Sequence, residues 1–500
     1  ALCTFRAKGK RDFLYANGSK SLFSVKLLDE DGAPSILRSE EMQCRADVGK
    51  ERTVFHYTAK DFFVDAVIRH PTDEPFVYFT MCVRNQTGKY LEWVDFPNIW
   101  VPNDLPAAGG NSHLFWPAME GCLIEDVSLR DRTYMRYSEK GYPSKGWEGM
   151  YPGPCPMQFF AYYGDDGNGM YLAAHDTHGN VKAFEYHAVD EGKAICLENK
   201  LFVGENDTSD YSFEYELVLG VFTGDWYAAA DIYRRWLMQT DIIRVPRFEE
   251  NENIPAWVKD SPVIAVYPVR GVKDTGDMSP NCYYPYTNGL PYIDKLGKDL
   301  DSRMMALLCH WEGTAPWAPP FVWPPYGDEQ NFREYILSLH KKGHLFGLYC
   351  SGIQWTEKST ICPEYNMEKY SEEHGMKKLM CCAPDQSLPY SLICGGPIRT
   401  GYDMCPAPEQ TKQLAVGEIK KIVDGCDVDY LQFFDQNIGG TSYLCYSKEH
   451  GHPRGPGKWM VREMREIYSR AKKLLRDRHR DKCMLIGCEA AAAVFQRFNV

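Results

Sequence analysis

The spacing of apolar residues follows two different patterns along the chain, and the pattern changes near residue 224. Before that point, short runs rich in Val, Phe, Tyr and Thr are separated by turn signals about every ten residues. Turn dipeptides such as Asn17-Gly18 and Asp31-Gly32 favour hairpins. The apolar runs cover residues 21–28, 53–58, 62–69, 76–84 and 213–221. This pattern predicts a large β-sandwich domain over residues 1–223.

A segment with helical spacing lies between these two regions of the chain. The tripeptide Gly224-Asp225-Trp226 is typical of a helix start, and the apolar residues that follow share one helical face. These residues are Trp226, Ala229, Ala230, Tyr233 and Leu237. A polar linker over residues 247–253 comes next. We therefore expect a connecting helix and linker over residues 224–253.

From residue 254 onward, short apolar runs alternate with helical patterns, which is typical of parallel β/α units. The five runs cover residues 262–269, 304–309, 345–350, 429–434 and 483–488. No glycine-rich phosphate loop follows any of them, so a nucleotide-binding sheet is disfavoured. The pattern predicts a (β/α)8 TIM-type barrel over residues 254–500 that is incomplete after about five strands. We expect the natural chain to continue past Val500 with at least three more β/α units.

The residues that follow the apolar runs carry the candidate chemistry, because barrel active sites lie at the C-terminal ends of the strands. Asp435 follows the fourth run and Glu489 the fifth. Neighbouring strands are about 4.8 Å apart, so two such carboxylates can reach the roughly 5–5.5 Å separation of retaining glycosidases. Asp435 is the expected nucleophile and Glu489 the expected acid/base. The candidates for substrate binding are Arg270, His310, Trp311, Glu312, Tyr349, Trp355, Gln436, Asn437 and His452.

Composition narrows the range of partners. The net charge of −12 and the pI of about 5.6 disfavour a nucleic-acid partner. No run approaches the roughly 20 apolar residues that span a bilayer, so no membrane partner is expected. Aromatic residues make up 14% of the chain, and their faces stack well on sugars. We expect an oligosaccharide or glycan substrate, while the oligomeric state is not fixed by the sequence.

The 18 cysteines are scattered without any CxxC pair. Zinc ligands with regular spacing are absent, so we predict reduced thiols, no metal site and no cofactor. A long segment over residues 352–406 contains Cys362, Cys381, Cys382, Cys394 and Cys405. It is expected to be a lid or substrate-binding insertion, or else a small subdomain packed for stability. Thiols without evident partners favour the cytoplasm, but a chain that starts at Ala1 leaves a removed signal peptide open.

Three segments resemble a known enzyme family. They are Gly224–Ala230, Val428–Asp435 and Met484–Glu489. In this order the chain resembles large bacterial glycoside hydrolases, particularly the endo-α-N-acetylgalactosaminidases and their uncharacterised relatives. The resemblance implies a fourth barrel strand that ends in the nucleophile Asp435 and a fifth that ends in the acid/base Glu489. The chain departs from the family pattern at two places. It has an extra loop over residues 443–458, and it has Gln436 at a position where the family usually has Trp.

The leading function is therefore a glycoside hydrolase that cleaves α-linked sugars with retention of configuration. The alternative is a carbohydrate-binding protein on a glycosidase-like scaffold without catalysis, which would not need the Asp435–Glu489 pair. A lyase or isomerase would require a metal cluster or a phosphate loop, and the sequence offers neither. The sequence does not identify the sugar, the linkage or endo against exo action.

Overall fold

The structure is a computed structural model. It describes residues 2–6, 11–15, 21–105, 110–119, 121–125, 127, 149–204, 210–242, 248–252, 254–393, 398–478 and 484–495. The predicted turn at Asn17-Gly18, part of the predicted linker, Cys394 and Cys483 lie outside these residues.

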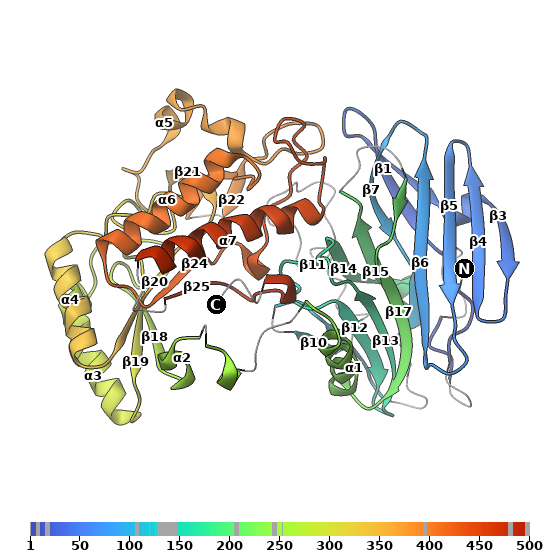
Figure 1. Cartoon of the computed structure of the whole chain (residues 1–500), viewed down its shortest axis with the longest axis horizontal. Coiled ribbons are helices and arrows are strands. Elements are labelled where there is room, and N and C mark those ends of the chain that lie inside the picture. The colour runs from blue at the N-terminus through green and yellow to red at the C-terminus, as the bar shows by residue number, and fades with distance from the viewer. Residues whose placement is uncertain are drawn as a thin grey trace.

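The N-terminal part of the chain forms two antiparallel sheets, shown in blue and green in Figure 1. Within the described residues, one sheet has the order β11 (Met150–Tyr151), β14 (Lys182–Val189), β15 (Ala194–Phe202), β7 (Tyr90–Asp95), β1 (Ser24–Leu28) and β2 (Pro34–Arg38), with β8 (Ile99–Pro102) paired to β15. The other has the order β10 (Cys122–Glu125), β9 (Ser112–Trp116), β12 (Phe159–Gly164), β13 (Asn168–His175), β17 (Glu216–Thr223), β6 (Phe76–Asn85), β5 (Phe62–Arg69), β4 (Arg52–Ala59) and β3 (Gln43–Val48), with β16 (Tyr211–Ser212) paired to β6. The prediction of a strand-rich N-terminal half is confirmed.

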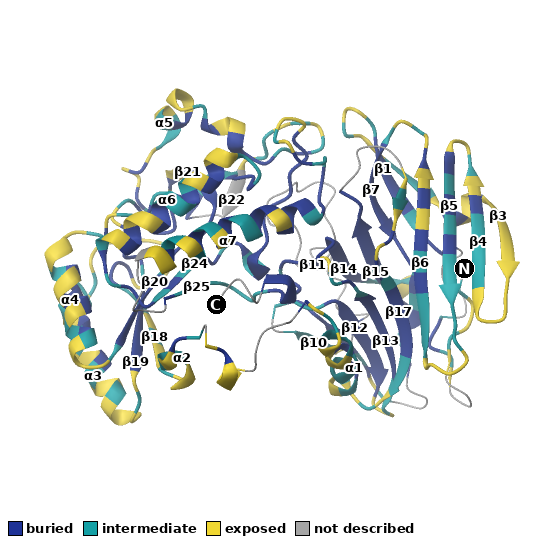
Figure 2. Ribbon diagram, viewed as in Figure 1, coloured by how far each residue is buried: buried dark blue, intermediate teal, exposed yellow. Residues whose placement is uncertain are grey.

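Aromatic side chains pack the two sheets against each other. The ring of Phe160 on β12 lies 5.5 Å from that of Phe184 on β14, in an edge-on arrangement. Trp116 on β9 donates a hydrogen bond from Nε1 to the carbonyl oxygen of Phe184. The facing strands are buried, whereas β3 at the edge is exposed (Figure 2). Burial of these large rings gives the sheets a common core.

Helix α1 (Trp226–Met238) covers the outer face of the larger sheet, as the apolar face of the sequence predicts. Asp225 begins the helix, because its side chain accepts a hydrogen bond from the backbone N–H of Tyr227. Trp226 stacks on Phe115 of β9, with ring centroids 5.6 Å apart. This packing holds the helix against the end of the strand-rich half.

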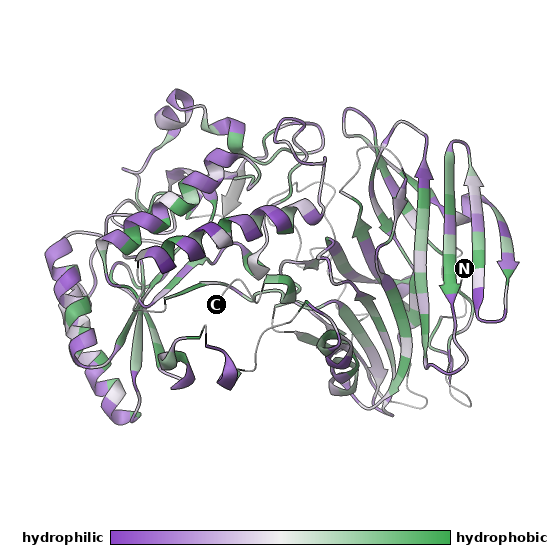
Figure 3. Cartoon of the chain, in the orientation of Figure 1, coloured by the Kyte–Doolittle hydropathy of each residue, from purple (hydrophilic) through white to green (hydrophobic). Residues whose placement is uncertain are grey.

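The C-terminal part contains a parallel sheet whose strands follow one another in chain order. Among the described residues its order is β18 (Val263–Pro268), β19 (Met304–Cys309), β20 (Leu345–Tyr349), β24 (Tyr430–Phe434) and β25 (Leu485–Cys488). The helices of this part are α2 (Ala256–Lys259), α3 (Leu290–Asp299), α4 (Glu329–Lys341), α5 (Glu368–Glu373), α6 (Glu409–Gly425) and α7 (Lys458–Arg478). Figure 3 shows apolar strands in the middle and polar outer faces on α3 and α4. The order shows no reversal of the kind found in doubly wound sheets, and closure into a barrel stays a prediction.

The segment between β20 and α6 is a small subdomain rather than a simple loop. Its strands β21 (Gln354–Ser359), β23 (Arg399–Asp403) and β22 (Ser391–Ile393) form an antiparallel sheet in that order. Tyr370 of helix α5 and the buried Met380 pack with Trp355 of β21 and Tyr402 of β23 in one apolar cluster. Of the two alternatives left open by the sequence, the structure agrees with a packed subdomain.

The strand-rich half and the parallel sheet are joined by close contacts. The hydroxyl of Tyr446 donates a hydrogen bond to the buried carboxylate of Glu92 on β7. Lys458 at the start of α7 forms an ion pair with Glu214, at 2.8 Å. The backbones of Gly204 and Gly457 also meet, and a Cβ added to Gly204 would lie 2.0 Å from the carbonyl oxygen of Pro456. Only glycine permits this approach.

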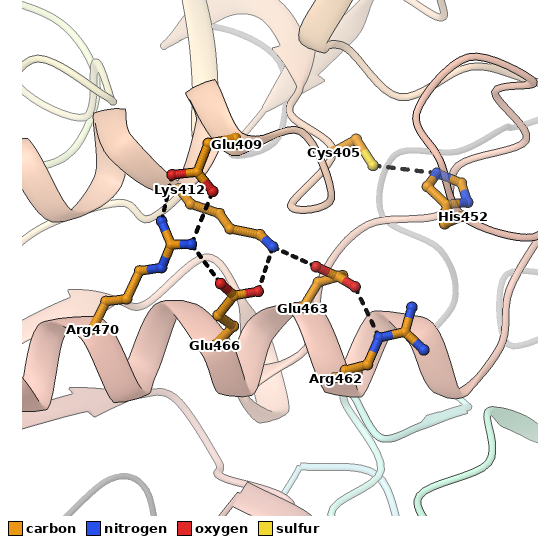
Figure 4. Close-up of polar contacts among 8 residues, drawn as sticks. All are labelled: Cys405, Glu409, Lys412, His452, Arg462, Glu463, Glu466 and Arg470. Atoms are coloured by element: carbon orange, nitrogen blue, oxygen red, sulfur yellow. Dashed lines mark hydrogen bonds and ion pairs between the residues drawn. The ribbon is translucent and has the colours of Figure 1, made fainter.

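Helices α6 and α7 are connected by a charged cluster (Figure 4). Lys412 on α6 lies 2.5 Å from both Glu463 and Glu466 on α7, and its side chain is 7% exposed. We expect Lys412→Met to destabilise the protein by about 3 kcal/mol, because Glu463 would be left buried without its main cation. Lys473→Ala on the exposed side of α7 is the control, since its pair with Asp477 is open to solvent.

Thermal unfolding measures this difference. The unfolding midpoint falls by roughly 2–4 °C per kcal/mol in domains of about 150–250 residues. The Lys412→Met midpoint should therefore drop by several degrees, and the Lys473→Ala midpoint should change by no more than about 1–2 °C. Equal effects of the two substitutions would show that the buried cluster contributes no more than an exposed ion pair.

Candidate functional site

Asp435 and Glu489 come from neighbouring strands at equivalent positions. Strands β24 and β25 pair in parallel, and Phe434 is the register partner of Cys488. Asp435 and Glu489 each follow their paired residue by one position. The pairing is irregular between Leu431 and Phe434, so the end of β24 departs from a flat ladder just before Asp435. The sheet therefore places both carboxylates at its C-terminal edge.

Backbone hydrogen bonds tie together the two loops that carry these carboxylates. The N–H of Gly439, after β24, donates to the carbonyl oxygen of Glu489, at 2.7 Å. In return, the N–H of Ala492 donates to the carbonyl oxygen of Gly439, at 3.0 Å. Gly439 has a φ of 72° and lies against Gly153, where an added Cβ would be 2.0 Å from a carbonyl oxygen. The two loops are thus held in a fixed relation to each other and to the strand-rich half.

The electrostatics of Asp435 also reflect the presence of Glu489. Asp435 is 2% exposed, and the pKa of its carboxyl group is raised to about 7. Burial is the largest cause of this rise and the negative charge of Glu489 the second, whereas a hydrogen bond from Gln436 acts in the opposite direction. Gln436 donates from Nε2 to Oδ2 at 3.2 Å, and Gln432 on β24 donates to Oδ1. Two interacting carboxyl groups of this kind titrate as a pair.

Glu312 and His310 follow β19, and both are buried. Burial raises the pKa of Glu312 to about 7. Its Oε1 accepts a hydrogen bond from the N–H of Trp317, and among the described residues its Oε2 has no hydrogen-bond partner. His310 donates from Nδ1 to the carbonyl oxygen of Arg270 and accepts at Nε2 from Trp317 Nε1, both at 2.8 Å. Burial lowers the pKa of His310, so the ring is neutral near pH 7.

Two of the predicted sugar platforms are instead part of the core. Trp311 is 0% exposed, stacks near Phe332 and donates from Nε1 to the carbonyl oxygen of Tyr349. Trp355 is also 0% exposed and packs between Phe321 and Tyr370. A ring with no accessible face cannot stack on a sugar, so we exclude both residues from the proposed site. Tyr349 itself is half-buried, with its ring edge-on to Trp317 at 4.7 Å.

Arg270 and Asn437 use their polar atoms internally. The guanidinium of Arg270 donates to the carbonyl oxygens of Met278 and Glu312 and lies over the ring of Tyr326. Asn437 accepts from the N–H of Ile353 and donates to the carbonyl oxygen of Thr441. Both residues therefore hold the loops of the site through these contacts, and a role in substrate binding stays a prediction.

His452 contacts a cysteine, since its Nε2 lies 3.4 Å from the sulfur of Cys405. Gln436 lies beside Asp435, and its backbone carbonyl oxygen accepts a hydrogen bond from the Tyr443 hydroxyl at 2.9 Å.

The sequence reasoning missed two residues of the site. Gln432 lies on β24 and holds Asp435, but an internal strand position gives no signal of this role. Asp274 lies in the loop after β18, with Oδ1 3.4 Å from His310 Nε2. Burial, and then the charges of Glu312, Asp274 and Asp435, raise the pKa of Cys309 to about 12 at the end of β19. These carboxylates therefore surround one end of the sheet, and the position of Asp274 after the first strand was the available signal.

The family model described as "Domain of unknown function (DUF6259)" matches residues 211–499, more than half of the chain. The chain belongs to this family. The DUF6259 segment begins at β16, runs through α1 and the parallel sheet, and contains both Asp435 and Glu489.

Glycoside hydrolases are among the proteins to which this DUF6259 member is similar. A protein of Monosiga brevicollis named "Putative glycoside hydrolase 22789" is 28% identical over 123 residues, which are 23% of this chain and 10% of that protein. The chain thus matches only a tenth of the length of this curated relative. The α-N-acetylgalactosaminidase NagBb of Bifidobacterium bifidum, in complex with GalNAc, has a TM-score of 0.65 at 12% identity, with 95% of this chain and 72% of that chain covered. Its ligand-free form has a TM-score of 0.63 at 13% identity, covering 94% and 72% of the two chains. At these identities the likeness shows a shared fold.

Among the residues that the structure describes, no helix has both the length and the apolar character needed to cross a membrane.

Proposed function

We propose that this chain is a glycoside hydrolase that cleaves α-linked sugars with retention of configuration, with Asp435 as nucleophile and Glu489 as acid/base. The observation that carries the proposal is the placement of these two carboxylates one residue past register partners on adjacent parallel strands. The coupling of their charges supports it. The fold shared with an α-N-acetylgalactosaminidase favours an α-N-acetylgalactosaminide or a related α-galactoside as substrate. The sheet corresponds to the first five strands of a (β/α)8 barrel in this proposal.

The reaction needs two displacements. In the first, an oxygen of Asp435 forms a bond to the anomeric carbon while the bond from that carbon to the leaving oxygen breaks. The reactive form of the coupled pair is the one in which Asp435 is ionised and Glu489 holds the shared proton, and Glu489 gives this proton to the leaving oxygen. In the second, Glu489 takes a proton from water, and the water oxygen displaces Asp435 from the anomeric carbon. The sugar is released with its original configuration, and both carboxyl groups return to their starting states.

The neighbouring groups have supporting roles in this mechanism. Gln432 and Gln436 each donate a hydrogen bond to one oxygen of Asp435, which fixes the direction of attack. Glu312 is as buried as Trp311, so we propose that it holds the loop after β19 by accepting the hydrogen bond from the N–H of Trp317, rather than that it contacts the sugar.

The proposal is tested by incubating the protein with aryl α-glycosides of N-acetylgalactosamine, galactose and glucose. We expect hydrolysis of at least one of these substrates. Proton NMR should show the α-anomer as the first product, before mutarotation. A first-formed β-anomer would show inversion and overturn the mechanism. Binding of the sugars without turnover would favour the carbohydrate-binding alternative.

The dependence of activity on pH gives a second test. Asp435 must be ionised to attack, so kcat/KM on an activated aryl glycoside should fall as the pH drops through an apparent pKa of about 7. Because Glu489 raises the pKa of Asp435, Glu489→Gln should move this acid limb to lower pH. Glu334→Gln, an exposed substitution on α4, is the control and should leave the limb in place. An acid limb that does not move in Glu489→Gln would contradict the coupling.

A further inference from the structure

Two histidines and two cysteines converge outside the carboxylate site. Cys405 lies between β23 and α6, whereas Cys445, His450 and His452 lie in the loop between β24 and α7. Their ligand atoms (two sulfurs and two ring nitrogens) all lie within 4.8 Å of one another. Both cysteines are fully buried, and His452 is 9% exposed. Figure 4 shows Cys405 and His452 facing each other near the start of α6.

From this cluster we propose that Cys405, Cys445, His450 and His452 bind one structural Zn²⁺ ion. The proposal does not depend on the glycosidase function. Two thiolates and two imidazoles form one of the common ligand sets of structural zinc sites.

The distances agree with tetrahedral coordination. Cys405 Sγ lies 3.4 Å from His452 Nε2, and Cys445 Sγ lies 3.4 Å from His450 Nδ1. A zinc ion with bonds of about 2.3 Å to sulfur and about 2.0–2.1 Å to nitrogen places such atoms roughly 3.6 Å apart. Cys405 and Cys445 are free thiols in this structure. The four ligand atoms therefore surround a space of the right size.

The second nitrogen of each ring is held by a backbone carbonyl. His450 Nε2 lies 2.9 Å from the carbonyl oxygen of Lys378, and His452 Nδ1 lies 2.7 Å from that of Pro453. A carbonyl oxygen can only accept, so these nitrogens carry the protons in the neutral rings. The lone pairs of His450 Nδ1 and His452 Nε2 then face the sulfurs. Metal-binding histidines are oriented in this way.

Further contacts fix the other ligands. The ring of His452 stacks on buried Trp459, with centroids 3.6 Å apart and an angle of 8° between planes. The N–H of Cys382 points at Cys445 Sγ, at 3.5 Å, a contact that would stabilise a thiolate. The N–H of Cys405 donates to the carbonyl oxygen of Leu379, which aligns this segment with the subdomain.

The metal would connect two loops at the same edge of the sheet. Cys405 belongs to the end of the subdomain inserted after β20, and the other three ligands belong to the loop that begins at Asp435. The sequence predicted no zinc site because it contains no zinc ligands with regular spacing. The ligands Cys445, His450 and His452 are close in sequence, but the fourth is forty positions earlier and is brought in only by the fold.

Metal analysis of the purified full chain tests the proposal. Protein prepared without chelators should contain about one zinc per chain, falling below about 0.1 in Cys405→Ser and Cys445→Ser. Cys426→Ser is the matched control, since it changes a buried thiol that contacts the carbonyl oxygen of Ile422 at the far end of α6, outside the ligand set, and it should retain the zinc. Removing zinc with a chelator should lower the midpoint of thermal unfolding of the wild type but not that of Cys405→Ser.

Cobalt substitution keeps the test informative if a variant fails to fold. Wild-type protein reloaded with Co²⁺ should show thiolate-to-cobalt charge transfer and the intense visible bands of a tetrahedral site. The proposal is overturned by wild-type protein that contains no zinc after expression in zinc-supplemented medium. It is equally overturned by full zinc content in Cys405→Ser, or by a Cys405–Cys445 disulfide in peptide mapping of protein prepared without reductant.

Discussion

Asp435→Asn should abolish turnover, with kcat falling by about 10⁴- to 10⁶-fold, or about 5–8 kcal/mol of transition-state stabilisation. The amide cannot form the glycosyl-enzyme bond, so the first displacement is lost for every leaving group. Initial rates on the best aryl α-glycoside measure the loss. Asp427→Asn is the matched control, because Asp427 precedes the same strand at its other end and its side chain is 43% exposed. Its activity should equal that of the wild type.

Stability separates loss of chemistry from loss of folding in this variant. Burial and the charge of Glu489 raise the pKa of Asp435 from 3.8 to about 7. The native state therefore binds the proton more tightly than the unfolded state, and stability is lost as the pH rises through about 7. Asn carries no such charge, so Asp435→Asn should be at least as stable as the wild type at pH 8.

Azide gives a direct assay of the attacking position. In Asp435→Ala, azide can occupy the space of the missing carboxylate and attack the anomeric carbon of an α-glycoside, releasing the aryl alcohol. The product should be the β-glycosyl azide, because a single displacement inverts the configuration. Near-normal activity of Asp435→Asn, or an α-glycosyl azide from Asp435→Ala, would show that another group is the nucleophile.

The limits of several strands could be predicted from the sequence because their apolar runs are short and are bounded by clear breaks. The run at residues 304–309 is β19 and the run at 62–69 is β5, with the same limits. The C-terminal ends of the strands then located Asp435 and Glu489 without any structural information. What the sequence could not provide was the pairing of Phe434 with Cys488, which depends on long-range register.

Side-chain direction was the main source of error. Trp311 and Trp355 stand beside strand ends, where a sugar platform is plausible, but their rings fill the core. Periodicity gives no information where a chain leaves a strand, so either face was open to these rings. The proposed zinc ligands gave no signal in the sequence for a different reason, because Cys405 lies forty positions before Cys445 and only the fold brings the two together.

Glu489→Gln should separate substrates by their leaving groups. Glutamine cannot donate the proton that the leaving oxygen needs, so kcat/KM on a natural glycan or an alkyl α-glycoside should fall by about 10²- to 10⁴-fold. An aryl glycoside with a strongly acidic phenol leaves without protonation, and its first displacement should slow by less than about tenfold. The second displacement still requires a base, so the glycosyl-enzyme should accumulate and give a burst of released phenol.

Trapping and rescue would complete the assignment of Glu489. Mass spectrometry of the quenched Glu489→Gln reaction should find one sugar attached to the peptide that contains Asp435. In Glu489→Ala, azide would enter from the opposite side to Asp435 and yield the α-glycosyl azide by two inversions. Glu334→Gln should show neither a burst nor a dependence on the leaving group. If kcat/KM of Glu489→Gln falls equally for good and poor leaving groups, Glu489 is not the acid/base. If the sugar is found attached to Glu489 in the wild type, the roles of the two carboxylates are exchanged.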